Sequence, residues 1–370
     1  MPNTIAMKKS LLFFLLLSFL FSCQEAETII QEVEVPREVD FEELAFSRGV
    51  FQRYFNMHKA GESLLVLGEN RIARIKLNEE DENCVYPWKD SHKEAISDDF
   101  YLNTTQNSLE FWSSISGSLC SSQLRTSLQN DSIDENINPS NTSQLNFLNF
   151  YSLISESHVL FPYSQGTNRK LKLALINMDF SQNSGTFARV FPEKIHTIEI
   201  QGVSYDDYLF LHWSMEDGFI FTVGGNDPQA FGTYKMNMDG SYQKIFDRVF
   251  IRVFSYQGRL YAMYDYFDQS YIIESQDGGL SWNQRFVADG IALAATSFYE
   301  LDDHLVGHWN GQLILVEEFN DSLFTTVELE ARELENDYIT SLAKLGDKVY
   351  ISTLSGIFSR DWEEFLGDKK

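Results

Sequence analysis

The sequence predicts an all-β fold in a single domain, and three observations support this prediction. Short apolar runs recur along the chain, each introduced by a polar turn, and several have a second apolar run just upstream, as in a β-hairpin. Aromatic residues make up 14% of the chain and there are only 7 prolines, a composition that suits twisted sheets packed face to face. No long segment shows a convincing helical period, so a helical architecture is disfavoured.

The spacing of the apolar runs predicts the type of all-β fold. Each run is expected to continue into third and fourth strands, joined by acidic turns such as NMDGS and SQDGG. Four strands in about 40 to 45 residues, repeated along the chain, are the signature of a β-propeller blade. We therefore expect a single β-propeller with seven four-stranded blades, and six or eight blades are the alternatives. The seven runs start at Glu62, Asn107, Ser157, Asp217, Gly258, Asp303 and Asp347.

The first residues have the layout of an export signal. Lys8 and Lys9 precede an apolar run from Leu11 to Phe21, which is shorter than the roughly 20 residues that span a bilayer. The run ends in LFSC, and this ending resembles the bacterial lipoprotein signal. The resemblance implies that residues 1–22 are a signal peptide and that Cys23 carries the lipid. An ordinary export signal with an incidental cysteine is the alternative.

The residues after the signal predict where the domain is held. CQEAE resembles the acidic tags that direct lipoproteins to the cell surface in Bacteroidetes-type bacteria. The resemblance implies a lipid-anchored protein of the bacterial outer membrane at the cell surface, with the periplasmic face as the alternative. Residues 23–44 are expected to form an acidic tether. The propeller domain is expected over residues 45–370, with a polar loop insertion near residues 121–144.

The chain is strongly acidic, with 54 Asp and Glu against 29 Lys and Arg and a net charge of −25. Such a chain repels phosphate groups, and no basic cluster interrupts the sequence, so nucleic-acid binding is disfavoured. The expected partners are the membrane, through the lipid on Cys23, and a glycan or an envelope protein.

Cysteine and histidine spacing gives no metal motif. Cys84 and Cys120 form either one structural disulfide or remain two free thiols, and the sequence leaves both alternatives open. His304 and His308 resemble a metal-binding pair, but their segment reads as a strand, where this spacing separates two residues by about 13 Å. No metal and no cofactor are expected.

The stretch SQDGGLSW is the most specific motif of the chain, and it resembles the Asp-box of sialidase-like and other propellers at every defined position. An aspartate here can accept hydrogen bonds from backbone N–H groups two or more residues on, and a glycine can take a positive φ. The tryptophan can bury its ring between blades. The resemblance implies a structural turn between the third and fourth strands of a blade, remote from any catalytic face. The residues of this Asp-box turn are Ser275, Asp277, Gly279, Ser281 and Trp282.

Four tyrosines crowd the segment YAMYDYFDQSY, at Tyr261, Tyr264, Tyr266 and Tyr271. They either pack between blades or form a platform on which sugar rings stack, with Asp265 and Asp268 binding sugar hydroxyls. Packing between blades is the favoured interpretation.

No catalytic residue stands out. Sialidase-like enzymes use an arginine triad, and Arg48 and Arg53 occur in a different setting from the early arginine motif of those enzymes. Other glycosidases need two carboxylates at a defined separation, and the sequence singles out no such pair. We therefore expect a cell-envelope lipoprotein whose non-catalytic propeller binds a glycan or a protein partner, or scaffolds an outer-membrane complex. A glycoside hydrolase or lyase of the sialidase-like propeller class is the alternative.

Overall fold

All residues described by the structure, which is a computed structural model, belong to one unit of the chain, Val39–Lys370. In parts of this unit the backbone is described without the side chains. The described residues are 41–47, 54–68, 71–77, 82–85, 92–97, 100–104, 108–115, 118–129, 137–139, 153–155, 157–165, 170–179, 182–183, 187–188, 191–203, 208–225, 227–267, 269–288, 296–309, 311–319, 324–331, 334 and 337–367.

Six four-stranded antiparallel sheets make up most of the described residues. The first two consist of β2 (Tyr54–Ala60), β3 (Ser63–Gly68), β4 (Arg71–Lys76) and β5 (Glu82–Val85), and of β6 (His92–Ser97), β7 (Phe100–Thr104), β8 (Ser108–Ile115) and β9 (Ser118–Gln129). The next two consist of β17 (Tyr208–Met215), β18 (Gly218–Gly224), β19 (Gly232–Asn237) and β20 (Tyr242–Phe246), and of β21 (Arg252–Tyr256), β22 (Arg259–Tyr266), β23 (Gln269–Ser275) and β24 (Asn283–Ala288). The last two consist of β25 (Ser297–Leu301), β26 (His304–Trp309), β27 (Gln312–Phe319) and β28 (Phe324–Leu329), and of β29 (Ile339–Leu345), β30 (Lys348–Thr353), β31 (Ile357–Asp361) and β1 (Glu42–Glu43).

A larger sheet lies between the β6–β9 and β17–β20 sheets along the chain. Its strands are β10 (Ile137–Pro139), β11 (Leu153–Ser155), β12 (His158–Gln165), β13 (Lys170–Asp179) and β16 (Phe191–Glu199). A separate two-stranded sheet consists of β14 (Gln182–Asn183) and β15 (Phe187–Ala188). The larger sheet has five strands because β12 is long enough to pair with β10 near one end and with β11 near the other.

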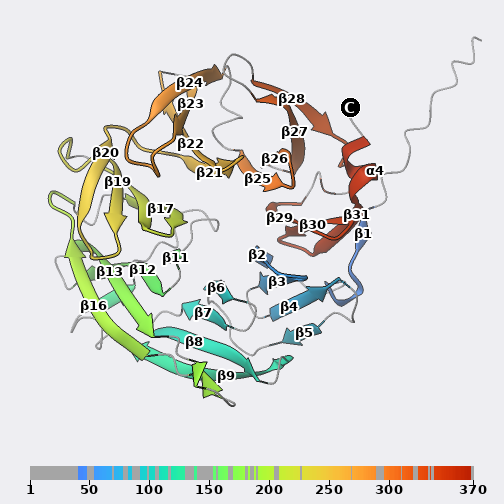
Figure 1. Cartoon of the computed structure of the whole chain (residues 1–370), viewed down its shortest axis with the longest axis horizontal. Coiled ribbons are helices and arrows are strands. Elements are labelled where there is room, and N and C mark those ends of the chain that lie inside the picture. Colours follow the sequence, from blue (N-terminus) through green and yellow to red (C-terminus); the bar gives the residue numbers. More distant parts are fainter. Residues whose placement is uncertain are drawn as a thin grey trace, which may run out of the picture. The chain divides into compact units, whose positions relative to one another are not determined.

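The sheets are arranged around a central axis (Figure 1). The innermost strand is the first strand along the chain in five of the four-stranded sheets, β29 in the sixth and β11 in the five-stranded sheet, and from there the chain zigzags outward. The innermost strands contact one another in a closed order, which is β2, β6, β11, β17, β21, β25, β29 and back to β2. This arrangement confirms the predicted single all-β propeller with four-stranded blades. The favoured number of seven such blades is wrong, and the alternative of six holds, because six of the described sheets are four-stranded.

The N-terminal strand closes the ring. β1 is the outermost strand of the last blade, where Glu42 pairs with Ser359 and Glu43 with Phe358. The predicted boundary between tether and propeller at residue 44 is therefore too late. The reason is that Phe41 is a core residue that packs edge-on against Phe365 of the C-terminal helix α4 (Trp362–Gly367), at 6.5 Å between ring centroids.

The polar insertion predicted near residues 121–144 is wrong in part. Residues 121–129 continue β9, which pairs with β8, and residues 137–139 form β10. β9 is the outermost strand of its sheet, and a strand in that place needs few apolar side chains to pair. Its polar composition therefore gave no strand pattern.

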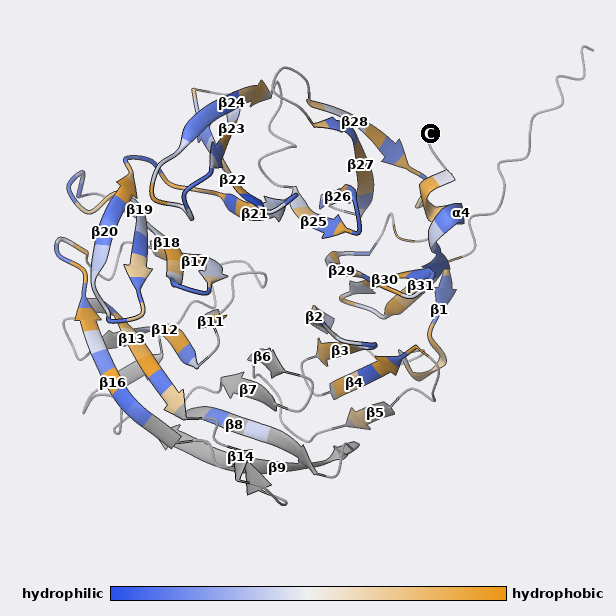
Figure 2. Ribbon diagram, in the orientation of Figure 1, coloured by the Kyte–Doolittle hydropathy of each residue, from blue (hydrophilic) through white to orange (hydrophobic). Residues whose placement is uncertain are grey.

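The hydrophobic core lies between neighbouring sheets. One cluster joins the last two blades and includes Val306 of β26, Ile351 of β30 and Trp362 of α4. Figure 2 shows hydrophobic residues concentrated in strands such as β13 and β27, whereas the outer strands β20 and β24 are mostly hydrophilic. Among the described residues, no helix has the length and apolar composition needed to cross a membrane.

Candidate functional site

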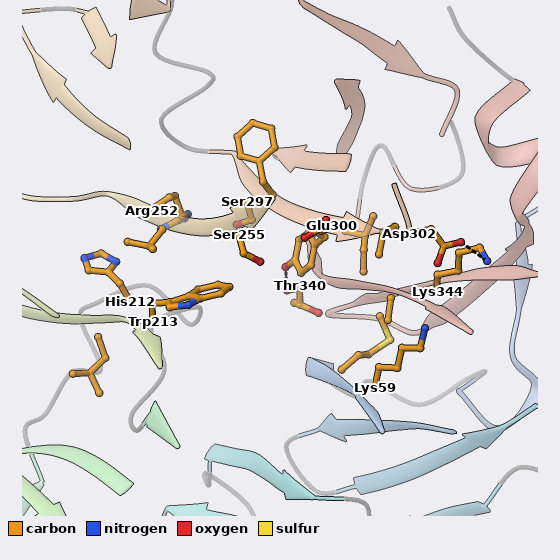
Figure 3. A pocket seen from close by; sticks show the side chains of 18 residues that line it. Lys59, His212, Trp213, Arg252, Ser255, Ser297, Glu300, Asp302, Thr340 and Lys344 are labelled. Carbon is orange, nitrogen blue, oxygen red and sulfur yellow. Dashed lines mark hydrogen bonds and ion pairs between the residues drawn. The ribbon is translucent and has the colours of Figure 1, made fainter. Parts of the chain in front are cut away.

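A cavity of about 580 Å³ lies among the innermost strands, and β2, β17, β21, β25 and β29 contribute its walls (Figure 3). A volume in this range suits a small organic ligand. Polar and aromatic side chains from different blades meet there only because the ring is closed. The cavity is therefore the natural candidate for a binding site.

β-bulges place two of the cavity's polar residues. The pairing of β17 with β18 shifts between Leu211 and Trp213, so His212 is an extra residue in the strand. A bulge breaks the alternation of side chains, and consecutive residues His212 and Trp213 both line the cavity as a result. The pairing of β29 with β30 shifts in the same way around Thr340, which also lines the cavity.

Arg252 lines the cavity together with two lysines, Lys59 and Lys344, and it is the charged residue on the side of His212. Its side chain is half-buried, one terminal guanidinium nitrogen (Nη1) donates to the carbonyl of Ile251 at 3.0 Å, and its buried Nε has no hydrogen-bond partner. Burial lowers the pKa of Arg252, and the phenols Tyr299 and Tyr338 act in the opposite direction. No carboxylate of a described residue forms a salt bridge with this guanidinium.

His212 lies beside Arg252 and is neutral. Burial, followed by the charge of Arg252, lowers the pKa of His212 to about 3. A hydrogen bond to the backbone of Phe250 acts in the opposite direction, so one ring nitrogen donates there. The buried Nε2 has no hydrogen-bond partner, and in this tautomer it is an acceptor.

Tyr299 and His308 belong to the same group of polar side chains as Arg252 and His212. The Tyr299 hydroxyl donates to the Thr340 carbonyl at 3.2 Å and lies 3.4 Å from Nε2 of His308. Because the hydroxyl has one hydrogen, His308 is the donor in the second contact. Burial raises the pKa of Tyr299 to about 12, and burial followed by Arg252 lowers the pKa of His308 to about 3. Arg252 is consequently the only one of these groups that is charged near neutral pH.

The carboxylates that line the cavity are already engaged. Asp302 forms an ion pair of 2.8 Å with Lys344, and both lie away from Arg252 (Figure 3). The Glu300 carboxylate accepts a hydrogen bond of 2.9 Å from the backbone N–H of Gln257. Neither carboxylate has the free, facing arrangement that glycoside hydrolysis requires of a pair.

The Asp-box turn joins β23 to β24, the third and fourth strands of their blade, and Asp277 is its organising residue. The Asp277 carboxylate accepts hydrogen bonds from the backbone N–H groups of Leu280 at 3.0 Å and Ser281 at 2.9 Å. It also accepts from the hydroxyls of Ser275 at 2.8 Å and Ser281 at 2.6 Å. These hydrogen bonds, with those of Ser281 the largest cause, lower the pKa of Asp277 to about 2.

The same turn packs against the preceding blade. Gly279 has φ +83°, and a Cβ there would lie 2.9 Å from the Ile220 side chain of β18. The Trp282 ring stands edge-on to Phe250 at 4.9 Å between centroids. Buried Lys235 of β19 donates to the Gly278 carbonyl at 2.9 Å, and its other partner is Asp217 at 2.8 Å. The turn therefore joins two blades, and its carboxylate is occupied by the turn itself.

The two histidines singled out by the sequence do not form a metal site. Both lie on strand β26, as predicted. His308 belongs to the Tyr299 group, whereas the His304 ring packs edge-on against Trp362 at 5.6 Å. Among the described residues, no three His, Cys, Asp or Glu side chains are grouped so that they could hold a metal ion.

The four tyrosines divide between core and surface. Tyr261 and Tyr264 are buried, and Tyr264 stacks on the half-buried Tyr271 at 5.0 Å between centroids. Tyr266 is exposed and carries the Arg248 guanidinium 3.5 Å from its ring centroid. They do not line the cavity. Asp265 accepts a hydrogen bond from the Ser270 hydroxyl, and Asp268 lies outside the described residues.

Cys84 is buried in β5 and is disulfide-bonded. The side chain of Cys120 lies outside the described residues, so its pairing with Cys84 stays a prediction. Cys23, Arg48 and Arg53 also lie outside the described residues.

The residues that shape the cavity were not singled out from the sequence. Arg252 and His212 lie in the apolar runs FIRVF and YLFLHW, which are the innermost strands β21 and β17. A charged or imidazole side chain inside such a run is a usable signal, because an innermost strand has no solvent face outside the channel. The two runs are 40 residues apart and belong to different blades, so no local motif connects them.

The fold and this cavity define the chain as a β-propeller with a polar central cavity. No family model matches the chain, and no curated protein matches it. Among solved structures, it is similar to the extracellular domain of the putative hybrid two component system BT4673 from B. thetaiotaomicron, with a TM-score of 0.52 and 12% identity. That match covers 87% of this chain and 43% of the other, so the chain spans less than half of that protein's length. It is also similar to an oligogalacturonate lyase in complex with manganese, with a TM-score of 0.54, 9% identity, and coverage of 84% and 90% of the two chains. At these identities the likeness shows the fold alone.

Proposed function

We propose that this chain is a non-catalytic, glycan-binding β-propeller of the bacterial cell envelope and that the central cavity is its binding site. The observation that carries the proposal is that two residues lining the cavity each have a buried side-chain nitrogen without a hydrogen-bond partner, Nε of Arg252 and Nε2 of His212. A buried polar group without a partner costs stability, so such groups in a cavity point to a ligand that completes their hydrogen bonds.

A small glycan fits the cavity better than a protein partner does. The cavity of about 580 Å³ is lined by five innermost strands, whereas a protein partner needs a broad surface. Ser255, Ser297 and Trp213 also line it. Hydroxyl partners and an aromatic face are the groups with which proteins commonly bind sugars.

A glycan screen with a blocked cavity tests this proposal. The full-length chain in mild detergent is applied to an array of neutral and acidic oligosaccharides, and hits are quantified by calorimetry. Ser297→Trp fills the cavity and should abolish binding, whereas Thr326→Trp, on the exposed outermost strand of the same blade, should leave binding unchanged. Binding that survives Ser297→Trp in a folded protein would place the site elsewhere. Turnover of a bound glycan that one carboxylate substitution abolishes would favour the glycoside hydrolase or lyase alternative.

The location of the protein is a second part of the proposal. A lipid on Cys23 would hold the propeller at the outer membrane, with the acidic residues that follow as a tether. Cys23→Ser should release the protein from the membrane fraction, and accessibility of the intact protein to protease on whole cells should distinguish the cell surface from the periplasmic face. Continued membrane association of Cys23→Ser would argue against lipidation.

A further inference from the structure

The electrostatic balance of the cavity narrows the class of glycan. Arg252 is the one positive group among the side chains that meet at this end of the cavity, and no described carboxylate neutralises it. His212 and His308 are neutral neighbours, and Tyr299 is a neutral phenol. A single positive charge in a partly desolvated site is matched best by a single negative charge.

A carboxylate matches this site better than a phosphate or a sulfate does. The planar guanidinium binds a carboxylate through two parallel N–H···O hydrogen bonds. A dianionic phosphate would bring a second negative charge with no cation to meet it, because both histidines are neutral. Sulfate has the same excess of charge.

The polar groups near Arg252 require a ligand that carries a hydrogen-bond donor as well as a carboxylate. Nε2 of His212 is an acceptor, and a carboxylate without hydrogens cannot satisfy it. A hydroxyl on the same ligand can donate to it. Trp213, the next residue of β17, also lines the cavity, and Figure 3 shows Arg252, His212 and Trp213 on the same side of the cavity.

We propose that the cavity binds a carboxylate-bearing sugar of the uronic-acid type, with its carboxylate on Arg252, a hydroxyl on His212 and its ring against Trp213. The inference rests on the proposed function and goes further by naming the ligand class. An uncharged sugar satisfies His212 and Trp213 but leaves Arg252 without an anion. A simple carboxylate satisfies Arg252 but leaves His212 without a donor.

D-glucuronate and D-glucose are the probes, because they differ only in carrying a carboxylate or a hydroxymethyl group at one carbon. Saturation-transfer NMR and calorimetry on the full-length chain in detergent should give an affinity for glucuronate about 10- to 100-fold above that for glucose, as a charge-assisted pair predicts. Acetate and inorganic sulfate, each alone, should bind more weakly than glucuronate.

Two substitutions separate the contribution of the carboxylate from that of the hydroxyl to sugar binding. Arg252→Gln should reduce glucuronate affinity about 10-fold or more and leave glucose unchanged, whereas His212→Phe should weaken both sugars. Arg248→Gln is the matched control, because Arg248 stacks on exposed Tyr266 outside the cavity, and it should change neither affinity. Circular dichroism and thermal melts confirm that each variant is folded.

The outcomes distinguish this inference from the proposed function. Equal affinities for glucuronate and glucose, both lost in Ser297→Trp, would overturn the uronic-acid inference and leave a glycan-binding cavity. Acetate or sulfate binding as tightly as glucuronate would overturn the sugar part of the inference. Undetectable binding of glucuronate at about 10 mM, well above the Kd of even a weak millimolar complex, would overturn it as well. If, in addition, Ser297→Trp abolishes the binding of no oligosaccharide on the array, the proposed function fails as well.

Discussion

Asp277→Ala separates the stability of the propeller from ligand binding. The carboxylate accepts four hydrogen bonds within one turn, from Ser275, Leu280 and twice from Ser281. Alanine removes the two carboxylate oxygens that accept these four hydrogen bonds, and water can replace them at the exposed residues Leu280 and Ser281. The turn lies between the third and fourth strands of its blade, whereas the cavity is lined by the first strand, β21. We therefore expect a loss of stability without a loss of affinity.

The depressed pKa sets the size of the effect. A drop from 3.8 to about 2 corresponds to at most about 2.4 kcal/mol of stability at neutral pH. Solvent screening at this exposed carboxylate reduces the electrostatic part to about 1 kcal/mol. Loss of the carboxylate that accepts from two backbone N–H groups is comparable to the loss of a helix N-cap. The expected total loss of stability is therefore about 1 to 2 kcal/mol. Since the folded-state pKa of Asp277 is lowered, this contribution is complete above about pH 4 and is lost as the pH falls from about 4 to 2.

Urea denaturation of the parent and Asp277→Ala at pH 7 and near pH 3 measures both quantities. The difference in free energy of unfolding should shrink toward the lower pH. Asp247→Ala is the control, since its carboxylate is 96% exposed and organises no turn, and it should have no measurable effect. An unchanged stability of Asp277→Ala at pH 7 would refute the structural reading of the turn. A loss of glycan binding at full stability would assign the turn a direct role in function.

Three further predictions concern the cavity and the closure of the ring. Arg252→Met should raise the free energy of unfolding by about 1 kcal/mol, because it removes a partly buried charge that has no counterion, and a destabilised variant in urea denaturation would show a structural role instead. Glucuronate affinity measured by calorimetry should be constant from about pH 5 to 8, because the pKa values of His212 and His308 are lowered to about 3. Arg252, Tyr299 and Tyr338 do not change their charge in this range either. A rise in affinity below about pH 6.5 would show that a histidine binds the anion in its charged form. Phe41→Ala should lower the free energy of unfolding by about 3 kcal/mol, since Phe41 belongs to the core that holds β1 on the last blade, and a loss below about 1 kcal/mol in urea denaturation would mean that the ring closes without it.

The blades were predictable because their determinants are local. A hairpin such as β21–β22 needs two apolar runs and a turn, and all three lie within about 15 residues, as sequence patterns require. Asp277 and its donors lie within seven residues of one another, so the turn can be read from the residues alone. The five-stranded sheet was not predictable, because two short strands pair with opposite ends of the long strand β12 and neither has a distinctive pattern.

Ring closure and the cavity depend on residues that are far apart in sequence. Glu42 pairs with Ser359, and nothing in the residues near Glu42 specifies that partner. Arg252 and His212 meet because two innermost strands converge on one axis, and the bulge at His212 depends on its pairing with β18. The sequence shows only that each is a polar residue in an apolar strand. Their common environment is a property of the assembled ring.

Two other buried charges of the same propeller are paired, and this contrast supports the interpretation of Arg252 as an anion-binding residue. Lys235 is 2% exposed and is paired with Asp217, and Glu274 is 1% exposed and pairs with Arg259 and Arg285. These groups lie within or between blades, where an unpaired charge would only cost stability. The guanidinium of Arg252 has no carboxylate partner among the described residues, and Arg252 lines the cavity. A fold that pairs these two buried charges but leaves Arg252 without a carboxylate keeps the charge of Arg252 for an anion from outside the chain.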